Sequence, residues 1–192
     1  IYKNFDINKV TGISISQNQI NRANELTNND NLSFIKMDAT NTNFNNDTYD
    51  AIWSFEMEPH IEDKKNMINE FLRILKPGGI LILGCWNSTE KEMKDSFLLD
   101  EWAHPNFWTI QQYKDVFNSH NLVKEYNSMD ITKNTLPSWE ESIKEGLRKP
   151  SILIKKPTKI FSMMREIIPI TKMAEAFDKD YMAFGVFVVT KK

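Results

Sequence analysis

Apolar and polar positions in the first half of the chain alternate between short β-branched runs and stretches with helical spacing. The runs predict four strands, at Val10–Ile15, Leu32–Met37, Tyr49–Phe55 and Ile80–Trp86. The periodic stretches predict helices at Gln17–Leu26, with Ser16 as N-cap, and at Lys64–Leu75, ended by Pro77 and two glycines. The last strand is apolar at nearly every position, which is typical of a strand buried on both faces. This order predicts an α/β fold with a doubly wound, mostly parallel sheet.

The second half of the chain is mainly helical and ends in a strand. The pattern predicts helices at Glu90–Ala103 and Thr109–Asn118, a weaker strand at Leu122–Met129, a helical stretch at Leu136–Asp180 broken at Pro150, Pro157 and Pro169, and a final strand at Met182–Thr190. We therefore expect a single domain over residues 1–192, with a helical insertion before its last strand. Such an insertion, at about residues 136–180, is a natural place for a lid over a substrate pocket.

Composition excludes several classes of protein. A net charge of −2 over 192 residues gives no electrostatic reason to expect a nucleic-acid partner. The single cysteine, Cys85, rules out a disulfide framework and predicts a reducing compartment, so we expect a cytoplasmic protein. No apolar run reaches the length of a transmembrane segment. The chain begins at Ile1 without methionine, and a transit peptide ahead of it would instead indicate a plastid.

Polar side chains follow each of the four predicted strands in turn. They are Ser14, Ser16 and Gln19 after the first, Asp38 after the second, Glu56, Glu58 and His60 after the third, and Asn87 and Ser88 after the fourth. Because ligands of open α/β sheets bind beyond the carboxyl ends of the strands, these groups are expected along one edge. Hydroxyls and carboxylates can bind a ribose, and a carboxylate can accept from an exocyclic amine. The sequence therefore predicts a site for an adenosine-type cofactor.

Several other kinds of site have no signature in the sequence. The six glycines permit neither a Gly-x-Gly-x-x-Gly turn nor a phosphate loop. The three histidines and Cys85 lack zinc-type spacing, so we expect no metal. A nucleotide-binding sheet without a glycine-rich turn is unusual. We therefore expect the first strand and its glycine loop to precede Ile1.

Four segments, in order, carry a resemblance to a known family: "VTGISISQNQINRANEL", "FIKMDAT", "YDAIWSFEMEPHI" and "EFLRILKPGGILIL". Together they resemble the class I S-adenosylmethionine-dependent methyltransferases, which have a Rossmann-like fold. The "GISIS" segment with Gln19, the "WSFE…H" segment and the C-terminal "ITKMAEAFDKDYMAFGVFVVTKK" are most similar to the tocopherol methyltransferase type. Sterol, cyclopropane-fatty-acid and small-amine enzymes are its relatives. Pro59 departs from that pattern, because the family usually has a glutamate there.

The resemblance implies S-adenosyl-L-methionine as the cofactor and assigns residues to it. Ser14 and Gln19 would contact the ribose or its surroundings. Asp38 would accept from the adenine amine, and Ala39 would donate a backbone N–H. Glu56 would face the methionine amino group or the acceptor. The cofactor-binding half would span residues 1–89 and the substrate-binding half residues 90–192.

The acceptor implied is a small or prenyl-lipid-like molecule, such as a phenolic ring of the tocopherol kind, which is compatible with peripheral membrane contact. His60 is the candidate base and Glu56 a second candidate catalytic group, since an imidazole exchanges protons readily near neutral pH. Three tryptophans would supply apolar walls: Trp102, Trp108 and Trp139. A small-amine or sterol methyltransferase, a nicotinamide-dependent oxidoreductase and a non-catalytic binding module are the alternatives. The acceptor atom and the oligomeric state have no signature in the sequence.

Overall fold

A computed structural model of the chain describes residues 7–91, 106–147 and 159–192, without the side chains of residues 146–147 and 159–167. The first unit is a β–α–β arrangement of β1 (Val10–Ser14), α1 (Gln17–Leu26) and β2 (Leu32–Lys36). The two strands pair in parallel, from Val10 opposite Leu32 to Ser14 opposite Lys36. The predicted N-cap is confirmed, because the Ser16 hydroxyl accepts the Gln19 N–H at 3.4 Å.

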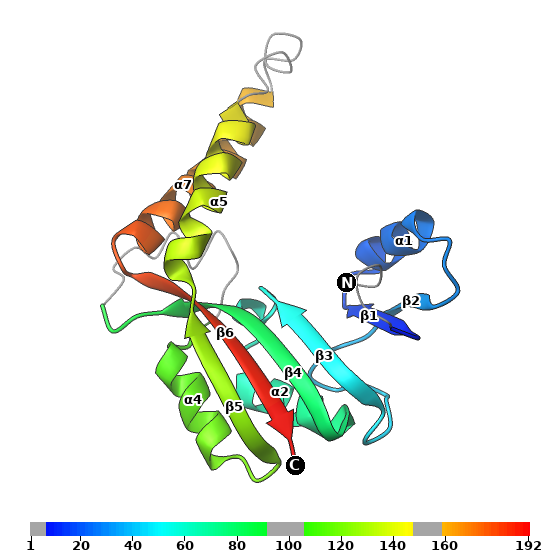
Figure 1. Ribbon diagram of the computed structural model, residues 1–192. Coiled ribbons are helices and arrows are strands. Elements are labelled where there is room, and N and C mark those ends of the chain that lie inside the picture. Colours follow the sequence, from blue (N-terminus) through cyan, green and yellow to red (C-terminus); the bar gives the residue numbers. More distant parts are fainter. Residues whose placement is uncertain (1–6, 92–105, 148–158) are drawn as a thin grey trace.

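A second sheet has four strands in the order β3–β4–β6–β5 (Figure 1). These strands are β3 (Tyr49–Phe55), β4 (Leu75–Ser88), β5 (Val123–Asp130) and β6 (Met182–Lys191). β3 and β4 are parallel, whereas β6 runs antiparallel to both of its neighbours. The α/β class and the four strands of the first half are thus confirmed. Figure 1 also shows β1 and β2 beside β3, as a sheet of their own.

The predicted turn at Pro77 takes the form of an irregularity within β4. α2 (Lys64–Ile74) begins at the N-cap Asp63 and ends one residue before the strand. The register with β3 jumps from Tyr49 opposite Leu75 to Ala51 opposite Ile80, so the Pro-Gly-Gly residues bulge out of the ladder. Gly78 lies there at φ 75°, a conformation that glycine adopts without strain. The extra residues let the chain pass directly from helix to strand.

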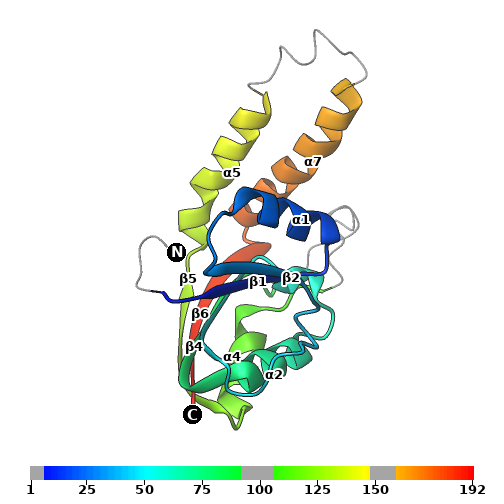
Figure 2. The ribbon, with the colours of Figure 1, turned by 90° about the vertical axis from the view of Figure 1, so that its right-hand side faces the viewer.

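The main core lies between the four-stranded sheet and two helices, α2 and α4 (Ile110–Ser119), which cover the same face (Figure 2). Its fully buried members include Leu81 and Leu83 of β4 and Phe187 of β6. Burial along β4 is uneven: Leu81 and residues 83–87 are buried, whereas Ile80 is 41% exposed, so the prediction of a strand buried on both faces holds only for its second part. α4 starts with a capping box, in which the Thr109 hydroxyl and the Gln112 side chain each accept the other residue's backbone N–H.

Two long helices, α5 (Thr132–Leu147) and α7 (Lys159–Asp178), project together from the sheet (Figure 1). They leave at the edge where β4 and β5 end and β6 begins, since Ser88 lies opposite Met182 and Asp130 opposite Gly185. In the described part of the chain, no helix is long and apolar enough to cross a membrane. This pair occupies most of the predicted helical insertion.

The prediction that Pro169 breaks this insertion was wrong, because α7 continues through it to Asp178. A proline inside a helix costs about 3 kcal/mol. Residues beyond it compensate by packing: Met173, Ala176 and Phe177 are buried in a second apolar cluster. Pro150, Pro157 and most of the helix predicted at Glu90–Ala103 lie outside the described residues.

Candidate functional site

The loops that follow β2 and β3 lie together at the carboxyl edge of the strands. The Asn66 amide in the first turn of α2 donates to the Thr40 carbonyl at 2.9 Å. Glu70, one turn further on, accepts the backbone N–H and the hydroxyl of Thr42 at 2.8 and 2.5 Å. Hydrogen bonds from Arg73 and Thr42 hold the pKa of Glu70 at about 2, so it stays ionised. α2 therefore fixes the loop after β2 beside the loop after β3.

Ser14 and Gln19, predicted to act together, are in contact. The Ser14 hydroxyl donates to Gln19 Oε1 at 2.6 Å and accepts the Ser16 N–H at 3.1 Å. These hydrogen bonds join Ser14, Ser16 and Gln19 at the junction between β1 and α1. Gln19 is exposed on the first turn of the helix, so its amide nitrogen can donate outward.

Asp38 and Ala39 divide the loop after β2 into a polar and an apolar part. Asp38 Oδ1 accepts both the backbone N–H and the hydroxyl of Thr40 at 2.8 Å. This Asx-type turn fixes the carboxyl group while its residue stays exposed. Oδ2 makes no hydrogen bond to the described residues that would compete with a ligand. Ala39 is buried in the main core, against which Ile13 and Met57 pack.

Glu56 stands immediately beyond β3 in a left-handed conformation, with φ 59°. A residue other than glycine in this region costs about 1–3 kcal/mol and often marks a functional position. Its backbone N–H donates to the Gly84 carbonyl at 2.8 Å, which holds the reversal against β4. The side chain is exposed. Strain therefore occurs at the residue that the strand pattern had singled out.

His60 ends a short 3₁₀ helix, η1 (Glu58–His60), and its imidazole lies on the surface. Its backbone N–H donates to the Met57 carbonyl at 3.0 Å. Pro59, the residue that departs from the family pattern, is buried in the first turn of η1. Its fixed φ suits that position, where an N–H would have no helical acceptor. Pro59 thus restricts the backbone just before His60.

Glu58 is the site-neighbouring residue that sequence reasoning missed. It was grouped with exposed strand-end residues, but the structure buries it completely, and Oε1 accepts the Ser54 hydroxyl at 2.6 Å. The apolar neighbours Met57 and Pro59 are a weak signal of burial. A solvated glutamate at the start of a helix would have the same local sequence.

The three predicted wall tryptophans do not form one surface in the structure. Trp102 lies outside the described residues. Trp108 belongs to the main core, with its ring edge-on to Tyr113 at 5.1 Å between centroids. Trp139 packs on the second cluster, 5.5 Å from the Trp86 ring and stacked 5.6 Å from Phe177. Of the two predicted wall tryptophans that the structure describes, Trp139 lies at the base of the α5–α7 pair and Trp108 does not.

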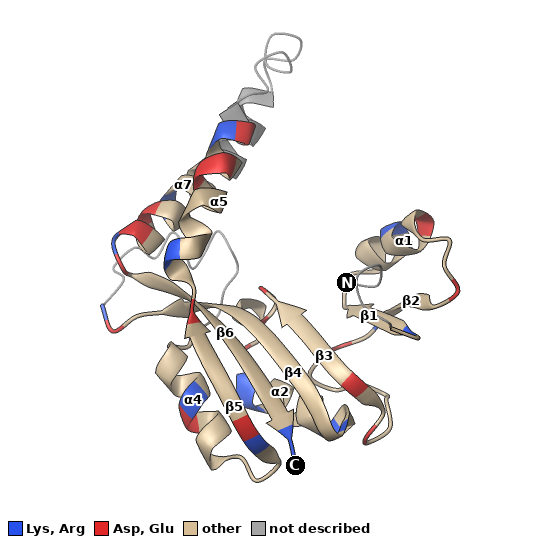
Figure 3. Cartoon of the chain, in the orientation of Figure 1, with Lys and Arg blue, Asp and Glu red and all other residues tan. Residues whose placement is uncertain are grey.

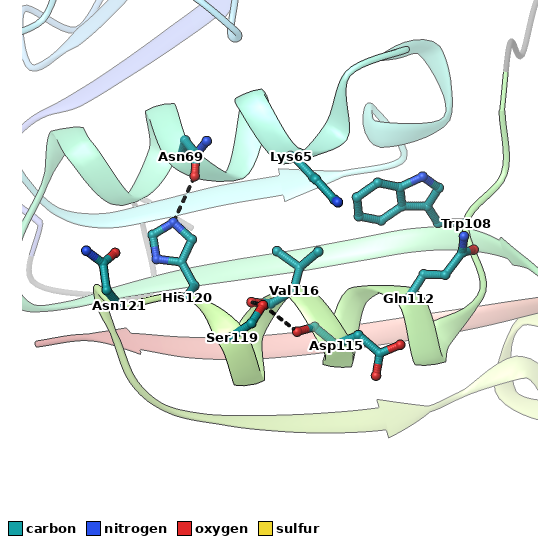
Figure 4. A pocket seen from close by; sticks show the side chains of 9 residues that line it. All are labelled: Lys65, Asn69, Trp108, Gln112, Asp115, Val116, Ser119, His120 and Asn121. Carbon is teal, nitrogen blue, oxygen red and sulfur yellow. Dashed lines mark hydrogen bonds between the residues drawn. The ribbon is translucent and has the colours of Figure 1, made fainter.

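A groove of about 710 Å³ runs between α2 and α4 (Figure 4). It is lined by Lys65, Asn69, Trp108, Gln112, Asp115, Val116, Ser119, His120 and Asn121. Of the predicted site residues that the structure describes, only Trp108 lines it. Across one end, the His120 ring nitrogen Nε2 lies 2.8 Å from Asn69 Oδ1, and Nδ1 accepts the Leu122 N–H at 3.1 Å. His120 thus links α2 to the turn before β5 in its neutral form.

This link predicts a pH dependence of stability. Burial, and next the charge of Lys192, lower the pKa of His120, so folding favours the neutral ring. Its contribution is present above the ordinary histidine pKa of about 6.5 and is lost as pH falls through the lowered value. The melting temperature is expected to fall between pH 8 and pH 5 more steeply in the wild type than in His120→Gln. Calorimetry on both proteins checks this, and parallel pH curves would contradict it.

The comparison with known proteins agrees with this geometry. Residues 1–83 match the model of a family described as a methyltransferase domain. A 2-methyl-6-phytyl-1,4-hydroquinone methyltransferase of Synechocystis is 34% identical over 95% of this chain and 61% of its own length. The chain is thus similar to methyltransferases along nearly its whole length. A chloroplastic tocopherol O-methyltransferase of Arabidopsis thaliana is 26% identical over 94% of the chain and 56% of its own length.

Solved methyltransferases share the fold of this chain at low sequence identity. A Haemonchus contortus phosphoethanolamine N-methyltransferase, solved with S-adenosylhomocysteine, superposes with a TM-score of 0.85 at 15% identity, over 98% of this chain and 45% of its own. A geranyl diphosphate C-methyltransferase of Streptomyces coelicolor gives 0.73 at 20% identity, over 96% and 63%. The chain therefore spans about three-fifths or less of these relatives' lengths.

Proposed function

We propose that this protein transfers a methyl group from S-adenosyl-L-methionine to a small acceptor. The observation that carries the proposal is the carboxyl edge of the strands, where Ser14 with Gln19, Asp38 and Glu56 follow three successive strands of a methyltransferase domain. Each of these groups is polar and accessible, and the neighbouring Ile13, Ala39 and Met57 are apolar. A hydrophilic ligand with an aromatic base suits such an edge.

In the proposed complex, each residue of this edge contacts a different part of the cofactor. The Ser14–Gln19 pair binds the ribose, because together they offer both donors and acceptors. Asp38 accepts from the adenine amine through Oδ2, since Oδ1 is already bonded to Thr40. Ala39 supplies a backbone N–H and an apolar contact. Glu56 faces the positively charged amino group of the methionine part, or the acceptor.

Methyl transfer requires mainly that the acceptor atom be aligned with the methyl group. The bound cofactor supplies an electrophilic methyl group on a sulfonium, whose neutral thioether is a good leaving group. The protein's task is to place the acceptor in line and to exclude water. A phenolic or protonated acceptor must also lose a proton. We assign that step to His60, whose imidazole lies on the surface four residues after Glu56.

The proposed acceptor is a phenolic prenyl lipid. In support, the most similar relatives named above are a phytyl-hydroquinone and a tocopherol methyltransferase. Trp86, Trp139 and Phe177 form an aromatic group at the base of the α5–α7 pair, on the same sheet edge as Glu56. Trp86 and Phe177 are buried and support Trp139, which is partly exposed, so an apolar tail would lie against the Trp139 ring. Such a substrate would bring the protein to a membrane surface.

Titration calorimetry tests the cofactor. The full-length protein is expected to bind S-adenosyl-L-methionine with a dissociation constant in the micromolar range. Reduced nicotinamide adenine dinucleotide, which the alternative nicotinamide-dependent oxidoreductase would bind, is expected not to bind. Absence of cofactor binding by a folded protein would overturn the proposal. Transfer of a labelled methyl group to prenylated hydroquinones, sterols and small amines, compared side by side, would identify the acceptor.

A further inference from the structure

A cluster of buried polar groups lies beneath residues 56–63, the segment that carries Glu56 and His60. At its centre is Glu58, which is 0% exposed. Oε1 accepts the Ser54 hydroxyl of β3 at 2.6 Å, whereas Oε2 has no partner of ordinary hydrogen-bond geometry among the described residues. Among the described residues, the other ionisable groups that face this cluster are Cys85 of β4, Lys64 of α2 and Tyr113 of α4.

Lys64 fixes the far end of the same segment. The side chain is buried to 1% exposure at the start of α2, and its ammonium donates to two backbone carbonyls. One is Ile61, within the segment, at 2.6 Å, and the other is Asn106, in the stretch leading to α4, at 2.7 Å. That stretch is itself bound to the end of β4, where the Ser88 hydroxyl donates to the Phe107 carbonyl at 2.9 Å.

Stability alone does not account for these two residues. Burial raises the pKa of Glu58 and lowers that of Lys64, so each side chain is costly to keep charged. An apolar residue of similar volume in place of a buried ionisable group is often neutral or stabilising. Glu58 and Lys64 instead fix the backbone position of the segment, because each joins it to a different part of the fold by hydrogen bonds of defined geometry.

We propose that Glu58 and Lys64 are positioning residues, which hold the segment 56–63 so that Glu56 and His60 face the bound cofactor and acceptor. Glu58 ties the beginning of the segment to β3, and Lys64 ties its end to the stretch before α4. The strained backbone of Glu56 is maintained between these two anchors and the Gly84 carbonyl. This inference rests on the proposed methyl transfer for its kinetic consequences, but its structural consequence is independent of that function.

The test replaces Glu58 by methionine, which keeps the volume and removes the hydrogen bond. We expect kcat to fall roughly 10- to 100-fold, because a displacement of about 1 Å can cost about 100-fold in rate. The melting temperature is expected to stay equal or rise. Glu58→Gln, whose amide can still accept from Ser54, should retain most of the rate. Glu62→Gln, an exposed change in the same segment, is the matched control.

Amide hydrogen exchange provides a readout that needs no activity. In Glu58→Met, exchange is expected to accelerate in residues 56–63 and to stay unchanged in β4 and α4. If the wild type fails to bind S-adenosylmethionine, the proposed function falls, and exchange alone decides the positioning role. Unchanged exchange, or a rate loss only in proportion to lost stability, would overturn the inference. Ser54→Ala removes the same bond from its other partner, and should reproduce both effects if Glu58→Met does not fold.

Discussion

Replacing His60 by alanine is expected to lower kcat for a phenolic acceptor by about 100-fold or more, the usual contribution of a general base. The affinity for S-adenosyl-L-methionine should change little, because the cofactor contacts are assigned to Ser14, Gln19, Asp38 and Glu56. The structure favours a local effect, since the ring is exposed and the backbone around it is held by Pro59 and the Met57 carbonyl. Single-turnover kinetics and calorimetry measure the two quantities separately.

Two further variants separate proton transfer from simple disturbance of the loop. His60→Gln keeps a polar side chain of similar reach but cannot take up a proton, so its rate should match that of the alanine variant. Glu62→Gln, two residues further on and also exposed, should behave as the wild type. Imidazole added to His60→Ala should restore part of the lost rate. A wild-type kcat in His60→Ala would return this residue to a structural role.

Much of the fold could be predicted because its signals are local. Tyr49–Phe55 was predicted with its observed bounds, and the Ser16 cap and the start of α2 follow from short-range hydrogen bonding. The apolar sequence of Ile80–Trp86 correctly indicated a strand, but not the exposure of Ile80 at its start. Such features depend on residues a few positions apart, which a single sequence contains in full.

Features that depend on distant contacts were predicted less well. The continuation of α7 through Pro169 rests on packing against residues far away in the chain, including Trp86 and Phe184. The separation of Trp108 from Trp139 depends on which side of β4 each neighbouring element packs. The sequence contains both tryptophans but does not specify the surface that either one covers.

The candidate site shows the same difference between local contacts and contacts made by residues far apart in the sequence. The Ser14–Gln19 contact and the turn at Asp38 span five residues or fewer, and the strand-end pattern pointed to both. The burial of Glu58 and Lys64 requires Ser54, Cys85, Tyr113 and Asn106 to meet beneath one loop. Charged residues are almost never fully buried, so local reasoning places them at the surface. The two buried anchors were therefore missed, whereas the exposed polar groups at the strand ends had been named as candidates.

Asp38→Asn is expected to weaken S-adenosyl-L-methionine binding by about 10- to 100-fold, the range for losing a hydrogen bond to a charged group. This substitution tests the contribution of the Oδ2 atom alone. Oδ1 can still accept both Thr40 groups, so the turn is kept, while an amide nitrogen takes the place of Oδ2 and opposes the adenine amine. Asp38→Ala removes the turn as well, and should weaken binding at least as much.

The matched control for this prediction is Asp30→Asn, an exposed aspartate in the same β–α–β unit. It changes the net charge equally and should leave the dissociation constant unchanged. Calorimetry on the three variants, with adenosine as a second ligand, locates the effect: the Asp38 variants should lose affinity for both ligands, because both carry the same base. Equal affinities in the wild type and Asp38→Asn would show that this carboxylate does not contact the base, and would leave the Ser14–Gln19 pair and Glu56 as the cofactor contacts to test next.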